Sequence, residues 1–126
     1  MDEERAAADF ACSAPKLQED FRAAANVSGK PRGLRWKSCE FQGPLLIARD
    51  RANGELVGLI GVTIAFEAIE GGGMEDVEAV GNLRAATAIF TWSGFDWTTA
   101  GRAVFNLEPP QVLKQYAENL TPIASQ

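Results

Sequence analysis

The residue cluster best suited to binding a ligand lies in the segment 92–97. Trp92 and Trp97 enclose a tetrapeptide that also carries Phe95 and Asp96. Aromatic rings around one carboxylate can line a small pocket or form a surface for a protein partner. If the segment is a hairpin turn, the two tryptophans instead face each other and cover the end of the core. These four residues are the candidate ligand or partner surface, and Asp96 would be the base of an enzyme here.

The other reactive residue types do not form a familiar catalytic pattern. The chain has no histidine, which excludes histidine triads, imidazole bases and histidine metal ligands. Its cysteines, Cys12 and Cys39, form no CxxC, which excludes a four-thiolate metal site within one chain. Arg35 and Lys37 near Cys39 would favour the thiolate, but without a histidine base we expect an inert, partly buried thiol. We predict no catalytic residue, no metal ligand and no cofactor.

A triple glycine at 71–73 lies within a group of five acids: Glu67, Glu70, Glu75, Asp76 and Glu78. The spacing of these acids does not match the alternate oxygen ligands of an EF-hand calcium loop. Backbone N–H groups of the glycines could bind an anion, but no lysine follows and the acids would repel phosphate. We therefore expect a solvated loop.

The charge balance limits the class of partner. The formal net charge is −5 and the sequence pI is about 4.7, which argues against nucleic acid and anionic membrane surfaces. The basic stretch 30–37 is expected to be a solvated linker. The longest apolar run, 56–66, is too short to cross a bilayer. The acidic N-terminus lacks the apolar core of a secretory signal, so we predict a cytoplasmic protein with free thiols.

The elements that must position these residues predict an α+β fold in one domain, 1–126. Residues 1–12 form either a frayed helix or a mobile tail. Ser13 as a cap and Pro15 in the first turn predict a helix over about 14–27. Its apolar stripe comprises Leu17, Phe21, Ala24 and Ala25. A strand over 34–41 and a turn at 42–44 follow.

The segment 45–69 predicts two apolar strands joined by Asn53-Gly54 in a type I′ turn. With a two-residue loop, Ala48 lies opposite Leu59. One face is expected to be core and carries Leu56, Ile60, Val62, Ile64 and Phe66. The second face carries Leu46, Ala48, Val57 and Leu59. We expect a helix or another subunit to cover it.

A short helix near 74–81 is favoured over a short strand and turn. Strands then follow at 85–92 and 97–107, with Trp92 opposite Trp97 and Ala88 opposite Gly101. Their inner face is made of small residues, as if another element packs close to it: Ala86, Ala88, Gly101 and Ala103. A C-terminal helix begins at Pro109-Pro110 and ends at Thr121-Pro122. The prediction is a five-stranded antiparallel sheet with an N-terminal and a C-terminal helix.

These features predict a small acidic binding or assembly domain that is not an enzyme and forms a homodimer or binds a protein partner. The expected element order resembles that of small acidic type III secretion chaperones, and this resemblance implies a dimer. The alternative is a small-ligand-binding or carboxylate-based enzyme fold. In it, a curved sheet wraps residues 13–27 and a pocket lies near Trp92, Asp96 and Trp97. Packing of the small-residue face against a helix or subunit would favour the binding domain. A cavity of about 300 Å3 or more along that face would favour the alternative.

Overall fold

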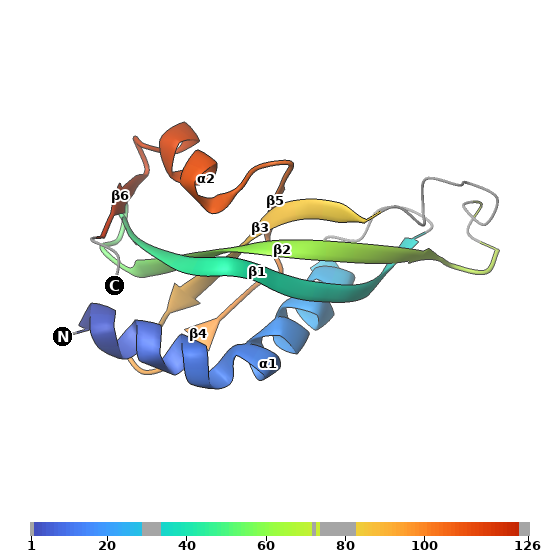
Figure 1. Cartoon of the computed structure of the whole chain (residues 1–126), viewed down its shortest axis with the longest axis horizontal. Coiled ribbons are helices and arrows are strands. Elements are labelled where there is room, and N and C mark those ends of the chain that lie inside the picture. Colours follow the sequence, from blue (N-terminus) through green and yellow to red (C-terminus); the bar gives the residue numbers. More distant parts are fainter. Residues whose placement is uncertain (1, 29–33, 72, 74–82, 124–126) are drawn as a thin grey trace.

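The computed structural model of the protein describes residues 2–28, 34–71, 73 and 83–123. Their elements in chain order are α1 (Asp2–Ser28), β1 (Leu34–Asp50), β2 (Leu56–Ala68), β3 (Arg84–Trp92), β4 (Trp97–Thr98), β5 (Ala103–Phe105), α2 (Pro109–Gln115) and β6 (Leu120–Pro122). The strands form one antiparallel sheet in the order β4-β3-β2-β1-β6, and β5 also pairs with β3. Figure 1 shows α1 against one face of this curved sheet and α2 against the other. The predicted α+β class, with a helix near each end of the chain, is confirmed.

Helix α1 begins at Asp2, twelve residues before the predicted start at 14. Ala6 and Phe10 are buried in the core and extend the stripe of Leu17, Phe21 and Ala25 towards the N-terminus. Of the two alternatives for 1–12, the described residues therefore form a helix. Pro15 lies inside this helix rather than in its first turn. Proline cannot donate to the carbonyl four residues earlier, so it bends a helix, and α1 changes direction part-way along in Figure 1.

Strand β1 is continuous where the sequence predicted two strands separated by a turn at 42–44. Gln42 pairs with Gly61 and Leu46 pairs with Leu59, so three residues of β1 stand opposite one residue of β2. Gly43, with φ 75°, lies in this bulge. The predicted turn was wrong because both halves of β1 pair with the same partner strand, and an insertion in one strand then produces a bulge.

The hairpin register was also wrong, by two residues: Ala48 lies opposite Val57 rather than Leu59. The N–H of Gly54 donates to the carbonyl of Asp50 at 2.7 Å, and the Asp50 carboxylate accepts the N–H of Ala52 at 2.8 Å. These bonds build a four-residue loop in place of the two-residue turn. Gly54 has the predicted positive φ, at 75°. Because the shift is an even number, every side chain stays on its predicted face.

The second hairpin starts in the predicted register and then shifts. Trp92 pairs with Trp97 as expected, but Ala88 pairs with Ala103 rather than Gly101. Between the two pairings the Thr99 hydroxyl donates to the Ile89 carbonyl at 2.9 Å and accepts the N–H of Gly101 at 3.0 Å. This side-chain bridge takes up two residues of the returning strand, which is why β4 and β5 are separate.

Helix α2 is much shorter than predicted and ends at Gln115. The chain then turns, and β6 pairs with the end of β1, with Leu120 opposite Asp50. Backbone pairing with β1 replaces the last turns of the predicted helix. The short helix expected near 74–81 lies outside the described residues and stays a prediction.

The sheet separates two apolar clusters. The first lies between α1 and the sheet and contains the predicted core face of β2, including Ile60, Val62 and Ile64. The second lies between α2 and the sheet, where Val57 and Leu59 pack with Val112. Leu59 is fully buried. A helix of the same chain therefore covers this part of the second face.

Candidate functional site

The structure buries both tryptophans of the candidate surface. Trp92 and Trp97 are 4% and 5% exposed, and their ring centroids are 5.3 Å apart. The Trp97 indole Nε1 donates to the Ala6 carbonyl of α1 at 2.8 Å. Phe10 packs edge-on against Trp97. The pair thus closes one end of the core, as the second interpretation of this segment expected.

Phe95 and Asp96 lie on the surface instead. The Asp96 carboxylate accepts a hydrogen bond from the Ser93 hydroxyl at 2.6 Å, and the N–H of Ser93 donates to the Asp96 carbonyl at 2.9 Å. Phe95 is 72% exposed. Through these two hydrogen bonds, Asp96 closes the turn between β3 and β4. Binding of a ligand or partner at Phe95 and Asp96 stays a prediction.

The small-residue face of the second hairpin packs against α1. Ala86 and Ala88 are buried in the first cluster. A Cβ added to Gly101 would lie 2.2 Å from the backbone nitrogen of Ala25. Only a glycine allows the two backbones to approach so closely. Packing against a helix is the arrangement that the sequence associated with a binding or assembly domain.

The two thiols lie in different surroundings. Cys12 is exposed, Cys39 is buried, and both are free. Burial raises the pKa of the Cys39 thiol to about 11, although the nearby Arg22 cation acts in the opposite direction. A thiol that keeps its proton is a poor nucleophile. Within the described ranges, no group of three or more histidine, cysteine or acidic side chains could hold a metal.

Part of the acidic group lies outside the described residues, namely Glu75, Asp76 and Glu78. Glu67 forms an ion pair: its carboxylate lies 2.8 Å from Arg35 Nε across β1 and β2. Both side chains are largely exposed, so this pair contributes little to stability.

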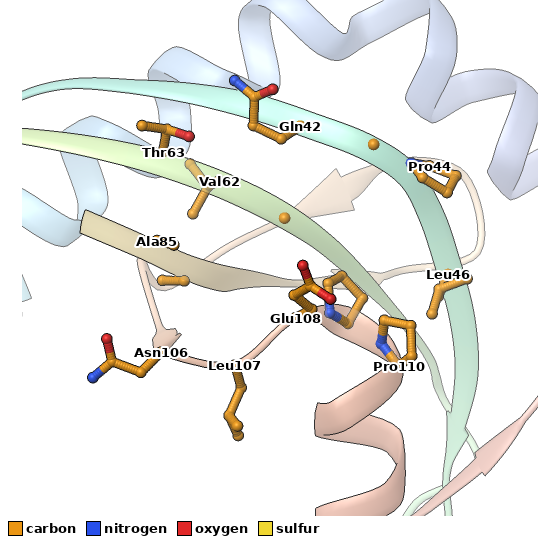
Figure 2. Close-up of a pocket in the computed structure, with 14 residues that line it drawn as sticks. Gln42, Pro44, Leu46, Val62, Thr63, Ala85, Asn106, Leu107, Glu108 and Pro110 are labelled. Atoms are coloured by element: carbon orange, nitrogen blue, oxygen red, sulfur yellow. The ribbon is translucent and has the colours of Figure 1, made fainter. Parts of the chain in front are cut away.

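A groove on the sheet face opposite α1 is the site that sequence reasoning missed. We call it the α2 groove; its volume is about 640 Å3. Strands β1, β2 and β3 line one side, and the segment that leads from β5 into α2 lines the other (Figure 2). Its described lining residues are Gln42, Gly43, Pro44, Leu46, Gly61, Val62, Thr63, Ala85, Ala86, Asn106, Leu107, Glu108, Pro109 and Pro110.

Small side chains and a fixed loop create the space in this groove. Gly61 and Ala85 leave the sheet surface low beneath it. The opposite wall is held by two bonds to β3: Thr87 Oγ1 donates to the Leu107 carbonyl at 2.8 Å, and the N–H of Asn106 donates to the Ala85 carbonyl at 2.9 Å. Asn106 has a φ of 65°, a left-handed conformation that asparagine tolerates better than most residues. The chain therefore turns sharply into α2 and stays clear of the sheet.

The chemistry of the α2 groove suits binding. Among its described lining residues only Glu108 is ionisable. Glu108 also forms a capping box with Gln111, whose side-chain oxygen accepts the N–H of Glu108 at 2.7 Å. The rest of the lining is apolar, with amide and hydroxyl groups at Gln42, Thr63 and Asn106. A carboxylate alone, with no nucleophile or second acid beside it, does not form a catalytic pair.

The sequence contained one signal for this site. Glu108-Pro-Pro-Gln111 has the spacing of a capping box, and it correctly marks where α2 begins. It does not show which part of the sheet α2 covers, so the groove could not be inferred from it. A second hollow, of about 430 Å3, lies farther along α2 and involves Tyr116, Arg102 and Thr91.

No protein-family model matches the chain, and neither do any curated protein or any solved structure. Neither helix in the described part of the chain is long and apolar enough to cross a membrane.

Proposed function

We propose that this chain is a small acidic binding domain without catalytic activity, and that the α2 groove is where it binds. The observation that carries the proposal is the groove itself. Its volume of about 640 Å3 falls within the range of about 300–1,000 Å3 typical of binding sites. It is mainly apolar, and its few polar groups could orient a bound side chain.

The first partner to consider is a second copy of the chain. A homodimer was expected because the second face of the hairpin is apolar. Helix α2 covers Val57 and Leu59, so an apolar face in need of cover no longer supports a dimer there. The support comes instead from the α2 groove, where the lining beside α2 remains open to a partner. Another protein that presents an apolar side chain would fit the same surface.

Light scattering and an environment-sensitive dye test this proposal. The wild-type chain should have about twice its 13.6 kDa mass at micromolar concentration. Ala85→Arg places a long cation in the α2 groove from an exposed strand position. This variant should be a monomer and should bind the uncharged dye Nile red at least about tenfold more weakly than the wild type, because a charge in an apolar site is costly.

The matched control is Ala23→Arg, which adds the same charge at an exposed position of α1. It should leave both the mass and dye binding at wild-type values. A monomeric wild type that still binds the dye in an Ala85-dependent manner would reject the homodimer but keep the groove. A monomeric wild type whose dye binding is indifferent to Ala85→Arg would reject the proposed site.

A cytoplasmic location belongs to the same proposal. Both thiols are free, and Cys12 is exposed, which suits a reducing compartment. Fractionation of cells that express the chain tests this location directly; recovery in an oxidising compartment would contradict it.

A further inference from the structure

The outer edge of β1, which faces away from β2, carries backbone groups that a neighbouring strand could pair with. Among the described strands, only β6 meets this edge, and it pairs with the last part, at Ala48, Arg49 and Asp50. The N–H of Ile123 also donates to the Ile47 carbonyl at 2.9 Å. This edge is therefore already shaped to accept an antiparallel strand.

Nearer the start of β1, side chains of α1 take the place of a strand. Asn26 Oδ1 accepts the N–H of Trp36 at 3.1 Å, and Arg22 Nη1 donates to the Trp36 carbonyl at 3.2 Å. Gln18 Oε1 accepts the N–H of Phe41 at 2.8 Å. Gln18, Arg22 and Asn26 follow one another at four-residue spacing, so they form a single stripe on the helix. We call these three residues the edge stripe.

A fourth side chain holds the edge stripe in place. Glu19 accepts hydrogen bonds from both Nε and Nη2 of Arg22. The hydrogen bond from Arg22 lowers the pKa of the Glu19 carboxyl, so the carboxylate stays charged and keeps the guanidinium directed at β1. Glu19 is thus a positioning residue for the stripe.

The middle of the edge is blocked by other means. Pro44 has no N–H to offer, and it lies in the bulge of β1 beside Gly43. Proline and bulges are both found where a strand edge must not pair with another chain. From Trp36 to Asp50, the edge is met in turn by the edge stripe, a bulge and β6.

We propose that the edge stripe prevents β1 from pairing with β1 of a second copy of this chain. The edge of an antiparallel strand is self-complementary about a two-fold axis, so an identical chain is the partner that it fits. Polar side chains on α1 satisfy the N–H and C=O of Trp36 and the N–H of Phe41, three groups that such a partner would use. The edge stripe belongs to a helix that Phe10, Leu17 and Phe21 anchor in the core. To expose the edge of β1, this helix would have to leave the core. Any native dimer must then use another surface.

The test is the triple variant Gln18→Ala, Arg22→Ala and Asn26→Ala. Alanine is the strongest helix former, so α1 should persist while the stripe is lost. At low concentration the amides of Trp36 and Phe41 should exchange their hydrogens at least about tenfold faster than in the wild type. At high concentration the mass should rise to twice that of the wild type, and both amides should regain protection.

Two further variants serve as controls. Lys16→Ala with Asp20→Ala removes an exposed ion pair from the same helix and should leave mass and exchange unchanged. Gln18→Glu with Asn26→Asp keeps an oxygen acceptor at both positions, so it should behave as the wild type does. If the triple variant does not fold, Gln18→Ala alone should speed exchange at Phe41 and leave Trp36 protected.

The inference is overturned if the triple variant keeps the wild-type mass at every concentration while it remains folded. Association that leaves Trp36 and Phe41 unprotected would also overturn it, because the contact would then lie elsewhere. Neither result depends on what the α2 groove binds, since every comparison is made with the wild-type mass.

Discussion

At the scale of single residues, several polar and reactive side chains have structural roles. Thr87, fully buried, holds the wall of the α2 groove through its bond to Leu107. Asp96 closes a turn through Ser93. The thiol of Cys39 is withdrawn into the core and keeps its proton. In the sequence, Asp96 and Cys39 were candidates for chemistry, and Thr87 was an ordinary strand residue. Their hydrogen bonds and burial give all three a structural role.

The buried thiol predicts a pH dependence of stability. The pKa of Cys39 rises from its ordinary 9.0 to about 11 in the folded chain. The unfolded chain therefore releases this proton first, and the thiol's contribution is lost as pH rises between those two values. Between pH 9 and pH 11 the free energy of unfolding should fall by up to about 2 kcal/mol more in the wild type than in Cys39→Ala. The free energy of unfolding is measured by chemical denaturation at each pH. If it fell equally with pH in the wild type and in Cys39→Ala, the burial of the thiol would be contradicted.

At the scale of elements, loops and ends differ most from the predictions. The loop between β1 and β2 is longer than Asn53-Gly54 alone suggests, because the N–H of Arg51 donates to the Asn119 carbonyl and its Nε donates to the Thr121 hydroxyl, both at 2.9 Å. Those contacts come from the segment that follows α2. The same segment ends α2 early and adds β6 to the sheet.

Gly54 remains the decisive residue of this loop. Its φ is 75° and a Cβ there would meet no atom within 4 Å, so any cost of substitution comes from backbone conformation alone. Gly54→Val should lower the free energy of unfolding by about 1–2 kcal/mol, measured by chemical denaturation. Gly54→Asn, which tolerates the left-handed region, should cost less than half as much. If valine were as stable as glycine, the loop would have to adopt another conformation.

At the scale of the whole molecule, one sheet separates a long helix, α1, from a short one, α2. Helix α1 spans the sheet and forms the larger cluster; α2 covers a smaller area and leaves the α2 groove beside it. The N-terminal turns of α1 are tied to the edge strand β4 by Trp97, whose indole N–H donates to the Ala6 carbonyl. Contacts far apart in sequence therefore decide how far α1 extends.

Two matched substitutions measure this tie. Trp97→Phe removes the hydrogen bond to Ala6, whereas the Trp92 indole N–H has no partner among the described residues. Both changes make the same truncation in the same buried pair. Trp97→Phe should therefore be about 1 kcal/mol more destabilising than Trp92→Phe, and it should speed amide exchange in the first turns of α1. Equal losses would mean that the bond to Ala6 contributes nothing to stability.

The sequence by itself determined the properties that depend on neighbouring residues. Alternation in β2 predicted that Ile60 and Leu59 lie on opposite faces of the sheet, because side chains alternate along any strand. The local turn at 93–96 predicted the pairing of Trp92 with Trp97, and Asn53-Gly54 predicted the positive φ of Gly54. The small residues around Gly101 predicted that another element packs close to them.

Only the tertiary structure decided what depends on distant partners. The start of α1 at Asp2 depends on burial of Ala6 and Phe10 against the sheet. A capping residue in the sequence does not predict such a long-range contact. The register of the first hairpin depends on contacts with residues near the C-terminus. The α2 groove exists because α2 stops short on the sheet face, and the edge stripe exists because α1 lies along the edge of β1. Local patterns fix which side a residue faces, but packing fixes what it meets there.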